Sequence, residues 1–335
     1  MLDHRQDASR IILDHRQDAS RIIVGNPAEF AKRVSRDRQG NYRGVSREKK
    51  LEHLRAKGVT LPARASNKRM NLAVERVFGT DDLRPIAWLD RAKAAADAVA
   101  MISLSLPGEK ESTATGFMVS AQLMMTNYHV LKTAAQAADK SVYATFGYEK
   151  SVDNRPLADA EMVPLDPSAF FIASKRLDYA IVALARTSDR KLPGDRYGRL
   201  PLIAAPSKAL PGSPLNIIQH PGGHHKQIAF RNNLMTDAET ETLAVYLTDT
   251  NPGSSGSPVL DDDFELVALH HSARDFRDQD GNKIDLNGDP VSGDTPDLLR
   301  YWVANEGIRV SAIVADLEKK KLTAKQRSLI SAAIT

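Results

Sequence analysis

Residues 248–260 read TDTNPGSSGSPVL, and the fold and the chemistry expected of the chain follow from this stretch. Ser255 follows Ser254 and precedes Gly256, and a second glycine, Gly253, stands two residues before it. Glycines beside a serine let the backbone turn tightly and bring N–H groups close to a substrate. A serine that transfers acyl groups needs such a turn, a base that takes its proton, and a carboxylate that orients the base. The stretch therefore predicts a nucleophilic serine, and a glycine-serine turn between strands is the alternative.

Two further stretches supply a base and a carboxylate. Residues 115–131 read TGFMVSAQLMMTNYHVL and contain His129 after a β-rich run. Residues 177–184 read LDYAIVAL, where Asp178 leads directly into an apolar run. A neutral imidazole accepts the serine proton, and a carboxylate holds that imidazole in the right tautomer. The chain order is histidine, aspartate, serine, which differs from the orders of subtilisin-like enzymes and of α/β-hydrolases.

These three stretches resemble the chymotrypsin-like serine peptidases, whose nucleophile lies in Gly-x-Ser-Gly-Gly/Ser-Pro and whose base lies in Thr-Asn-x-His-Val. The resemblance spans roughly residues 97–315 and implies that His129, Asp178 and Ser255 form a catalytic triad. It also implies an oxyanion hole made by the N–H groups of Gly253 and Ser255. The implied activity is that of a serine endopeptidase that cleaves proteins or peptides through an acyl-enzyme, with no metal and no cofactor. A catalytically silent homologue that binds peptides in the same cleft is the alternative.

Within that class, residues 255–271 (SGSPVLDDDFELVALHH) resemble the bacterial glutamyl endopeptidases. The resemblance implies a substrate pocket formed by Thr250 and His270, with His271 beside them, and cleavage after acidic residues, glutamate first. Asp249 supports a different specificity, because it occupies the position where trypsin-type enzymes keep an aspartate that receives Arg or Lys. A basic preference set by Asp249 is therefore the alternative.

The expected fold is all-β. Short β-rich runs separated by turn residues begin near Val99, which is typical of a sandwich or a barrel. The resemblance implies two six-stranded antiparallel β-barrels with the site in the cleft between them. We expect three parts: a mainly helical N-terminal extension (1–93), the double β-barrel (94–315) and a C-terminal helix (316–335). The reason for expecting that last helix is the stretch 311–334, which contains no proline and so should be helical.

The N-terminal extension is basic and begins with a repeat. The sequence LDHRQDASRII occupies residues 2–12 and again 13–23, and two copies are too few for a solenoid. Residues 31–70 hold thirteen Lys or Arg against three acidic residues. An acidic partner or nucleic acid is therefore a candidate ligand, and a solvated leader is the alternative. We expect a helix within residues 70–100, with Pro85 at its start or at a break.

The composition excludes cysteine chemistry and indicates where in the cell the protein is expected. The chain of 335 residues contains no cysteine, which excludes disulfides, a thiol nucleophile and thiolate metal sites. No stretch approaches the roughly 18 apolar residues of a membrane-spanning helix, and the charged start MLDHRQDASRII lacks the apolar core of a signal peptide. We therefore expect a soluble, cytoplasmic protein. His220, His224, His225 and the acidic loop 278–282 are expected to form turns instead of metal sites.

Overall fold

The computed structural model describes most of the chain from residue 84 onward, together with one helix before it. The described residues are 47–56, 84–205, 209–230, 233–237, 241–247, 252–275, 278, 281–285, 287–293, 295, 299–300 and 302–334. The repeat at 2–12 and 13–23, and the basic stretch 31–70 apart from helix α3 (Arg47–Ala56), lie outside these residues. The partners expected for the basic stretch and the domain boundaries stay predictions.

The first sheet is built from residues 99–183. Its strands are β1 (Val99–Leu104), β2 (Ser112–Met118), β3 (Leu123–Thr126), β4 (Val142–Phe146), β5 (Glu161–Pro164), β6 (Phe171–Ser174) and β7 (Tyr179–Ala183). Their order in the sheet is β5-β4-β1-β2-β3-β7-β6. An antiparallel bridge between Leu165 and Leu184 joins the chain after β5 to the chain after β7, so the sheet curls towards a closed barrel.

The second sheet is built from residues 216–309. Its strands are β8 (Asn216–Gln219), β9 (Gln227–Ala229), β10 (Met235–Asp237), β11 (Leu243–Tyr246), β12 (Pro258–Leu260), β13 (Leu266–Asp275) and β14 (Trp302–Arg309). Their order is β10-β11-β14-β13-β12-β8-β9. An antiparallel bridge between Pro214 and Leu234 joins the chain before β8 to the chain before β10, which curls this sheet in the same way.

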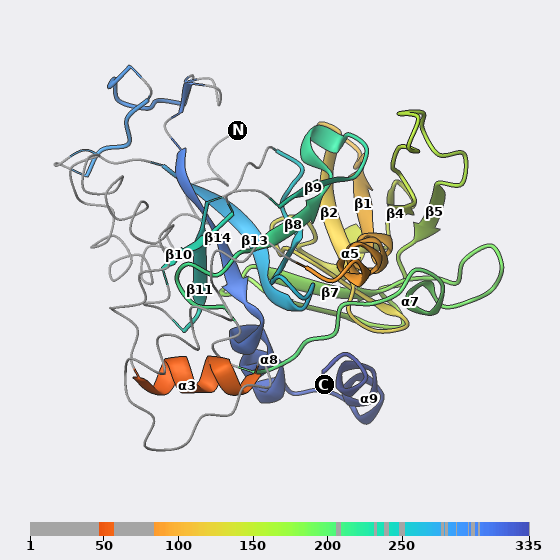
Figure 1. The fold of residues 1–335 in the computed structure, drawn as a ribbon. Coiled ribbons are helices and arrows are strands. Elements are labelled where there is room, and N and C mark those ends of the chain that lie inside the picture. Colours follow the sequence, from red (N-terminus) through yellow and green to blue (C-terminus); the bar gives the residue numbers. More distant parts are fainter. Residues whose placement is uncertain are drawn as a thin grey trace.

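The two antiparallel sheets lie side by side (Figure 1). The predicted all-β fold class is confirmed, and β1 begins at Val99, where the β-rich texture of the sequence starts. The predicted count of six strands is wrong, because each sheet has seven. Strands β5, β6, β9 and β10 have only three or four residues, and runs this short show no readable periodicity in a sequence.

Three clusters of buried side chains fill the fold, one inside each sheet and one between the sheets. Strand β7 contributes to two of them by the alternation of its side chains. Tyr179 and Ile181 belong to the cluster between the sheets, whereas Ala180 and Val182 belong to the cluster inside the first sheet. Both faces of β7 are therefore covered, which explains why its sequence is a continuous apolar run.

Short helices surround the sheets. They are α5 (Ala87–Asp97), α6 (Ala134–Ala137), α7 (Pro193–Arg196), the 3-10 helix η3 (Pro221–Gly223), α8 (Val310–Lys319) and α9 (Ala324–Ser331). Helix α8 buries Val310, Ile313, Val314 and Leu317 in the cluster between the sheets. Among the described residues, no helix is long and apolar enough to cross a membrane.

The C-terminal region forms two helices, so the single helix expected over 311–334 is interrupted. Helix α8 ends because Lys320 adopts an extended backbone. Thr323 then starts α9 with a capping box, in which the Thr323 side chain accepts the backbone N–H of Gln326 and the Gln326 side chain accepts the backbone N–H of Thr323. A capping box satisfies N–H groups that are otherwise unpaired at a helix start. The stretch TAKQ carries this signal in the sequence.

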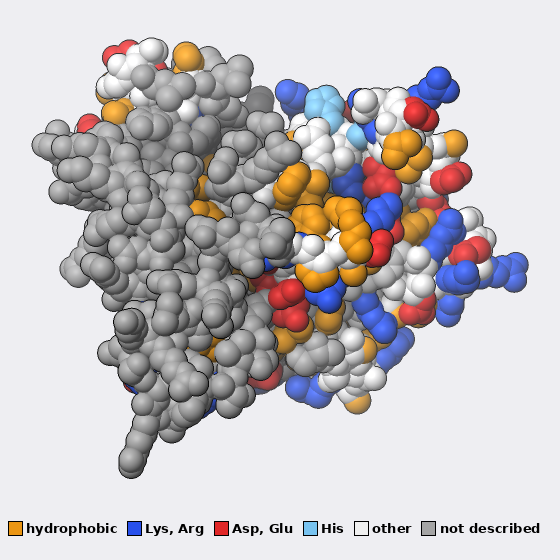
Figure 2. Space-filling view, in the orientation of Figure 1, with side chains coloured by type: hydrophobic (Ala, Val, Ile, Leu, Met, Phe, Trp, Pro, Cys, Tyr) orange, Lys and Arg blue, Asp and Glu red, His pale blue; other side chains and the backbone are white. Residues whose placement is uncertain are grey.

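Helix α5 starts two residues after Pro85, as expected, and lies on the surface. Its Trp88 turns inward, with the ring 5.0 Å from the ring of Phe264, and so connects the helix to the second sheet. Ile86 and Leu89 are exposed. Hydrophobic side chains gather over this part of the surface, where Lys, Arg, Asp and Glu side chains border them (Figure 2).

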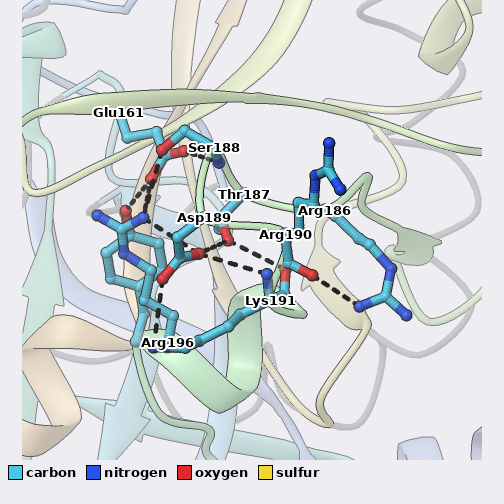
Figure 3. Close-up of polar contacts among 9 residues, drawn as sticks. Glu161, Arg186, Thr187, Ser188, Asp189, Arg190, Lys191 and Arg196 are labelled. Atoms are coloured by element: carbon cyan, nitrogen blue, oxygen red, sulfur yellow. Dashed lines mark hydrogen bonds and ion pairs between the residues drawn. The ribbon is translucent and has the colours of Figure 1, made fainter.

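A cluster of charged side chains fixes the chain where it leaves the first sheet (Figure 3). Arg196 of α7 lies 2.9 Å from Oε2 of Glu161 and 3.4 Å from Oδ1 of Asp189. Glu161 also accepts the backbone N–H of Ser188 and the hydroxyl of Tyr197, both at 2.6 Å. Solvent-accessible ion pairs contribute little to stability on their own. Glu161, however, contacts Arg196, Ser188 and Tyr197 at once, and so fixes the conformation of the segment that follows the first sheet.

Candidate active site

The pairing of β3 with β7 brings two of the predicted catalytic residues together. These strands are antiparallel, with Thr126 opposite Ala180, so the residues that follow β3 lie beside the residues that precede β7. Asn127 donates its side-chain N–H to the carbonyl oxygen of Asp178 at 2.9 Å. His129 comes two residues later and lies against the Asp178 side chain.

Both carboxylate oxygens of Asp178 contact His129. The backbone N–H of His129 donates to Oδ1 at 2.9 Å, and the ring Nδ1 lies 2.8 Å from Oδ2. The φ angle of Asp178 is 45°, in the left-handed region that aspartate and asparagine adopt more readily than most residues. The side chain of Asp178 is 13% exposed and that of His129 is 39% exposed. The carboxylate is therefore covered by the imidazole, and the imidazole remains accessible.

Asp178 stays ionised although it is buried. Burial by itself raises the pKa of a carboxyl group, because it disfavours the charged form. Here the interactions with His129 and His271 outweigh burial and hold the pKa of Asp178 well below its usual range. An ionised carboxylate keeps a proton on Nδ1 of a neutral imidazole and leaves Nε2 as the proton acceptor.

Ser255 belongs to the second sheet, in the turn that leads into β12. The pairing of β12 with β13 continues into this turn. The N–H of Gly256 donates to the carbonyl oxygen of His270 at 3.0 Å, and the N–H of His270 donates to the carbonyl oxygen of Ser257 at 2.9 Å. Ser255 is half-buried and is held beside the middle of β13. We call residues 252–257, which contain the predicted nucleophile Ser255, the nucleophile turn.

Thr115 joins the nucleophile turn to the first sheet. Its N–H donates to the carbonyl oxygen of Ser255 and its hydroxyl donates to that of Gly253, both at 2.9 Å. The carbonyl oxygen of Thr115 accepts the hydroxyl of Thr126, three residues before His129, at 2.8 Å. These described contacts include no hydrogen bond between Ser255 Oγ and the His129 ring, a contact that often tightens only when substrate binds.

Two positions of the nucleophile turn require glycine. Gly253 has a φ angle of 97° and Gly256 one of 86°, in the region that residues with a Cβ atom rarely adopt. A Cβ atom on Gly256 would overlap the carbonyl oxygen of Thr115, and one on Gly253 would lie 2.7 Å from the carbonyl oxygen of His220. The predicted oxyanion hole therefore lies in a turn whose shape depends on both glycines.

The predicted pocket residues differ in where the structure places them. His270 is buried, and its Nδ1 lies 2.7 Å from the hydroxyl of Tyr246. Burial lowers the pKa of His270 to about 3, so its ring is neutral. The side chain of His271 contacts Asp178 instead of the Tyr246–His270 pair. Asp249 and Thr250 lie outside the described residues, and their predicted roles stay predictions.

His271 faces two carboxylates. Its Nδ1 lies 3.4 Å from Oδ2 of Asp178, and its Nε2 lies 3.1 Å from Oε1 of Glu306. The second contact is an ion pair without the alignment of a hydrogen bond. Burial lowers the pKa of an imidazole, but the two carboxylates outweigh burial and raise the pKa of His271 to about 9. His271 is therefore charged at neutral pH.

Two residues of this charged group were not identified from the sequence, Glu306 of β14 and Arg274 of β13. Nε of Arg274 lies 2.5 Å from Oε2 of Glu306. Burial raises the pKa of Glu306, but His271 and Arg274 more than compensate and hold it well below its usual range. A signal was present, because Glu306 is the single acidic residue of the run WVANEGIRV, and a buried charge needs a partner.

His220, His224 and His225 lie in the expected turn. The Nδ1 of His220 lies 3.0 Å from the carbonyl oxygen of His224, and the ring of His225 stacks on Tyr148 at 4.4 Å. This segment includes η3. Within the part of the chain that the structure describes, no group of three or more His, Asp or Glu side chains is placed to hold a metal ion.

One family model matches the part of the chain that contains these residues. Residues 114–269 match the family model described as Trypsin-like peptidase domain. This match begins in β2, ends in β13, and includes His129, Asp178 and Ser255. It supports a hydrolase with a trypsin-like peptidase domain.

Two relatives are longer than this chain. An uncharacterized protein, y4fB, from Sinorhizobium fredii is 33% identical over 263 residues, which are 73% of this chain and 39% of that protein. Secreted RxLR effector protein 73 from Plasmopara viticola is 29% identical over 225 residues, which are 60% of this chain and 52% of that protein. The chain therefore spans less than two thirds of the length of either relative.

Two solved structures are similar at a low level. The Rv3671c protease from M. tuberculosis in its active form is 16% identical, with a TM-score of 0.45, over 72% of this chain and 90% of that one. The serine endoprotease from Yersinia pestis is 12% identical, with a TM-score of 0.44, over 73% of this chain and 68% of that one. Neither similarity bears on the chemistry of the site.

The charge of His271 predicts how stability depends on pH. Its folded-state pKa of about 9 lies above the value of about 6.5 for an unfolded histidine. Its stabilising contribution is therefore complete below about pH 6.5 and is lost as the pH rises through about 9. Urea denaturation across this range should show the free energy of unfolding falling, and the fall should be much smaller in His271→Gln. A constant free energy in the wild type would contradict the pairing of His271 with Asp178 and Glu306.

Proposed function

We propose that this protein is a serine endopeptidase in which Ser255 is the nucleophile, His129 the general base and Asp178 the carboxylate that orients the base. The observation that carries the proposal is the contact of both Asp178 oxygens with His129, because it holds the imidazole in the tautomer that accepts a proton on Nε2. The match of residues 114–269 to the trypsin-like peptidase domain supports the same activity.

In the proposed reaction, Ser255 Oγ attacks the carbonyl carbon of the scissile peptide bond while its proton passes to His129 Nε2. The N–H groups of Gly253 and Ser255 stabilise the negative charge that develops on the carbonyl oxygen. His129 then protonates the leaving amine as the C–N bond breaks, and an ester remains on Ser255. Water attacks this ester with His129 as base, which releases the carboxylic acid and restores the serine. Asp178 stays ionised and stabilises the imidazolium.

We further propose a preference for an acidic residue, glutamate first, on the acyl side of the scissile bond. His270 supports this preference as a neutral hydrogen-bond donor, because burial lowers its pKa to about 3. Burial also raises the pKa of Tyr246 well above its usual value, so the phenol keeps its proton and can donate it to His270 Nδ1. The His270 proton then resides on Nε2, where it is a donor for a substrate carboxylate.

A fluorophosphonate should label the wild-type protein once, at Ser255. Ser255→Ala should not be labelled, because the attacking hydroxyl is absent. Mass spectrometry of the digested adduct locates the label. Ser257→Ala is the matched control, since its hydroxyl donates to the carbonyl oxygen of Ser254 within the same turn, and it should still be labelled. Labelling that survives in Ser255→Ala would contradict the nucleophile, and an unlabelled wild type would favour the silent peptide-binding alternative.

Asp178→Asn should lower kcat for peptide cleavage by about ten-thousand-fold, the loss expected when the base is held in the wrong tautomer. The fold should survive, because asparagine also adopts the left-handed φ angle of this position. Circular dichroism checks the fold. Asp166→Asn, at a partly exposed carboxylate that accepts the N–H of Ala169, is the control and should keep its activity. A turnover of Asp178→Asn close to that of the wild type would show that another group orients His129.

The proposed specificity is tested by kcat/KM for peptides that differ only in Glu, Gln or Arg at the residue on the acyl side. A hydrogen bond to a charged group contributes about 1.5–3 kcal/mol, so His270→Ala should lower cleavage after Glu by roughly 10- to 100-fold relative to Gln. Tyr246→Phe should have a smaller effect in the same direction. An advantage of Arg over Glu that Asp249→Ser abolishes would establish the basic alternative instead.

A further inference from the structure

His271 interrupts the regular alternation of β13. The register between β13 and β14 shifts between His270 and Ser272, which makes His271 the extra residue of a β-bulge. Bulges redirect side chains and are frequent beside active sites. Here the two successive histidines have different neighbours, and the side chain of His271 is directed towards Asp178 of the first sheet.

The bulge places His271 in a buried group of four charges from three segments. Asp178 precedes β7, His271 and Arg274 lie in β13, and Glu306 lies in β14. The side chains of His271 and Glu306 are only 3% and 2% exposed. The negative charges of Asp178 and Glu306 are balanced by the positive charges of His271 and Arg274, so the group is neutral as a whole.

This balance matters because an unmatched buried charge is costly. Oδ2 of Asp178 lies between two imidazole nitrogens, Nδ1 of His129 at 2.8 Å and Nδ1 of His271 at 3.4 Å. Without a cation at the second position, Asp178 would face Glu306 with no charge between them. The carboxylate that orients the base would then be held from the His129 side alone.

We propose that His271 is a positioning residue of the catalytic site, which is held by Glu306 and fixes the Asp178 carboxylate against His129. The proposal rests on the peptidase function proposed above. His271 acts through Asp178 and does not contact the reacting atoms. This role differs from the substrate contact that the sequence predicts for it.

The charges around His271 determine the sign of its effect on the base. The groups that face it are Asp178 and Glu306, and Arg274 lies behind Glu306. Two further imidazoles interact electrostatically with these charges: His129 with Asp178, and His270 with His271 and Glu306. Removing the positive charge of His271 makes the surroundings of Asp178 more negative, so His129 should hold its proton more tightly.

The test is the rate of fluorophosphonate labelling at Ser255 as a function of pH. The rate falls at low pH because protonated His129 cannot accept the serine proton. His271→Gln keeps a hydrogen-bond donor but removes the charge. We expect its rate on the alkaline plateau to fall roughly tenfold, as when the outer partner of an active-site group is lost. We also expect the midpoint of the acid limb to rise by about one pH unit.

Glu306→Gln provides a second variant with the opposite expectation. It removes a negative charge while Arg274 remains, so the midpoint of its acid limb should move to lower pH. If His271→Gln does not fold, a midpoint of Glu306→Gln that stays at the wild-type value would overturn the proposal. Opposite shifts in the two variants are not expected from a general loss of packing, which would change the amount of active protein and leave the midpoint in place.

Controls separate this proposal from the function on which it rests. Glu161→Gln removes a carboxylate that pairs with Arg196 outside the site and is 15% exposed, compared with 2% for Glu306, and it should keep the wild-type profile. A wild type that is not labelled at Ser255 would overturn the peptidase function itself. Unmoved acid limbs in both variants would overturn the role of His271 alone. So would a changed preference of His271→Gln for Glu over Gln peptides without a shift of the limb.

Discussion

The contact between the Asp178 carboxylate and His129 is the interaction on which the rest of the site depends. The antiparallel pairing of β3 with β7 sets it up, because the residues after one strand meet the residues before the other. The left-handed backbone of Asp178 then allows its two oxygens to contact the backbone and the ring of His129. The proposed base and the carboxylate proposed to orient it therefore belong to one sheet. The nucleophile turn belongs to the other, and hydrogen bonds from Thr115 to Gly253 and Ser255 connect the two sheets at this point.

The successive residues His270 and His271 show how partners, and not burial alone, set the charge of a side chain. Both are buried in the same strand. His270 has a phenol as its neighbour, and burial lowers its pKa to about 3. His271 has two carboxylates as neighbours, and its pKa rises to about 9. One strand therefore provides a neutral donor for the proposed pocket and a cation behind Asp178. The β-bulge at His271 separates the two functions by turning its side chain towards the first sheet.

The sequence was informative where chemistry and local pattern coincide. The class of fold, the start of β1 at Val99 and the proximity of His129 to Asp178 all follow from short stretches around these residues. The number of strands did not, because edge strands of three or four residues carry no periodicity. The pairing of Asp178, His271 and Glu306 could not be predicted, since it depends on a bulge and on a register between distant strands, and the sequence indicated only that Glu306 needs a partner. The break between α8 and α9 was not expected in the proline-free stretch 311–334, although Thr323 and Gln326 carry the capping-box signal with which α9 starts.

The most direct test of the account is a crystal structure of the protein inactivated by a fluorophosphonate. The account predicts phosphorus bonded to Ser255 Oγ and a phosphoryl oxygen within about 3 Å of the N–H groups of Gly253 and Ser255. It also predicts His129 Nε2 on the side of the adduct where the leaving group departs, with both Asp178 oxygens still in contact with His129. An adduct on another residue, or a His129 ring turned away from Asp178 in the adduct, would contradict it.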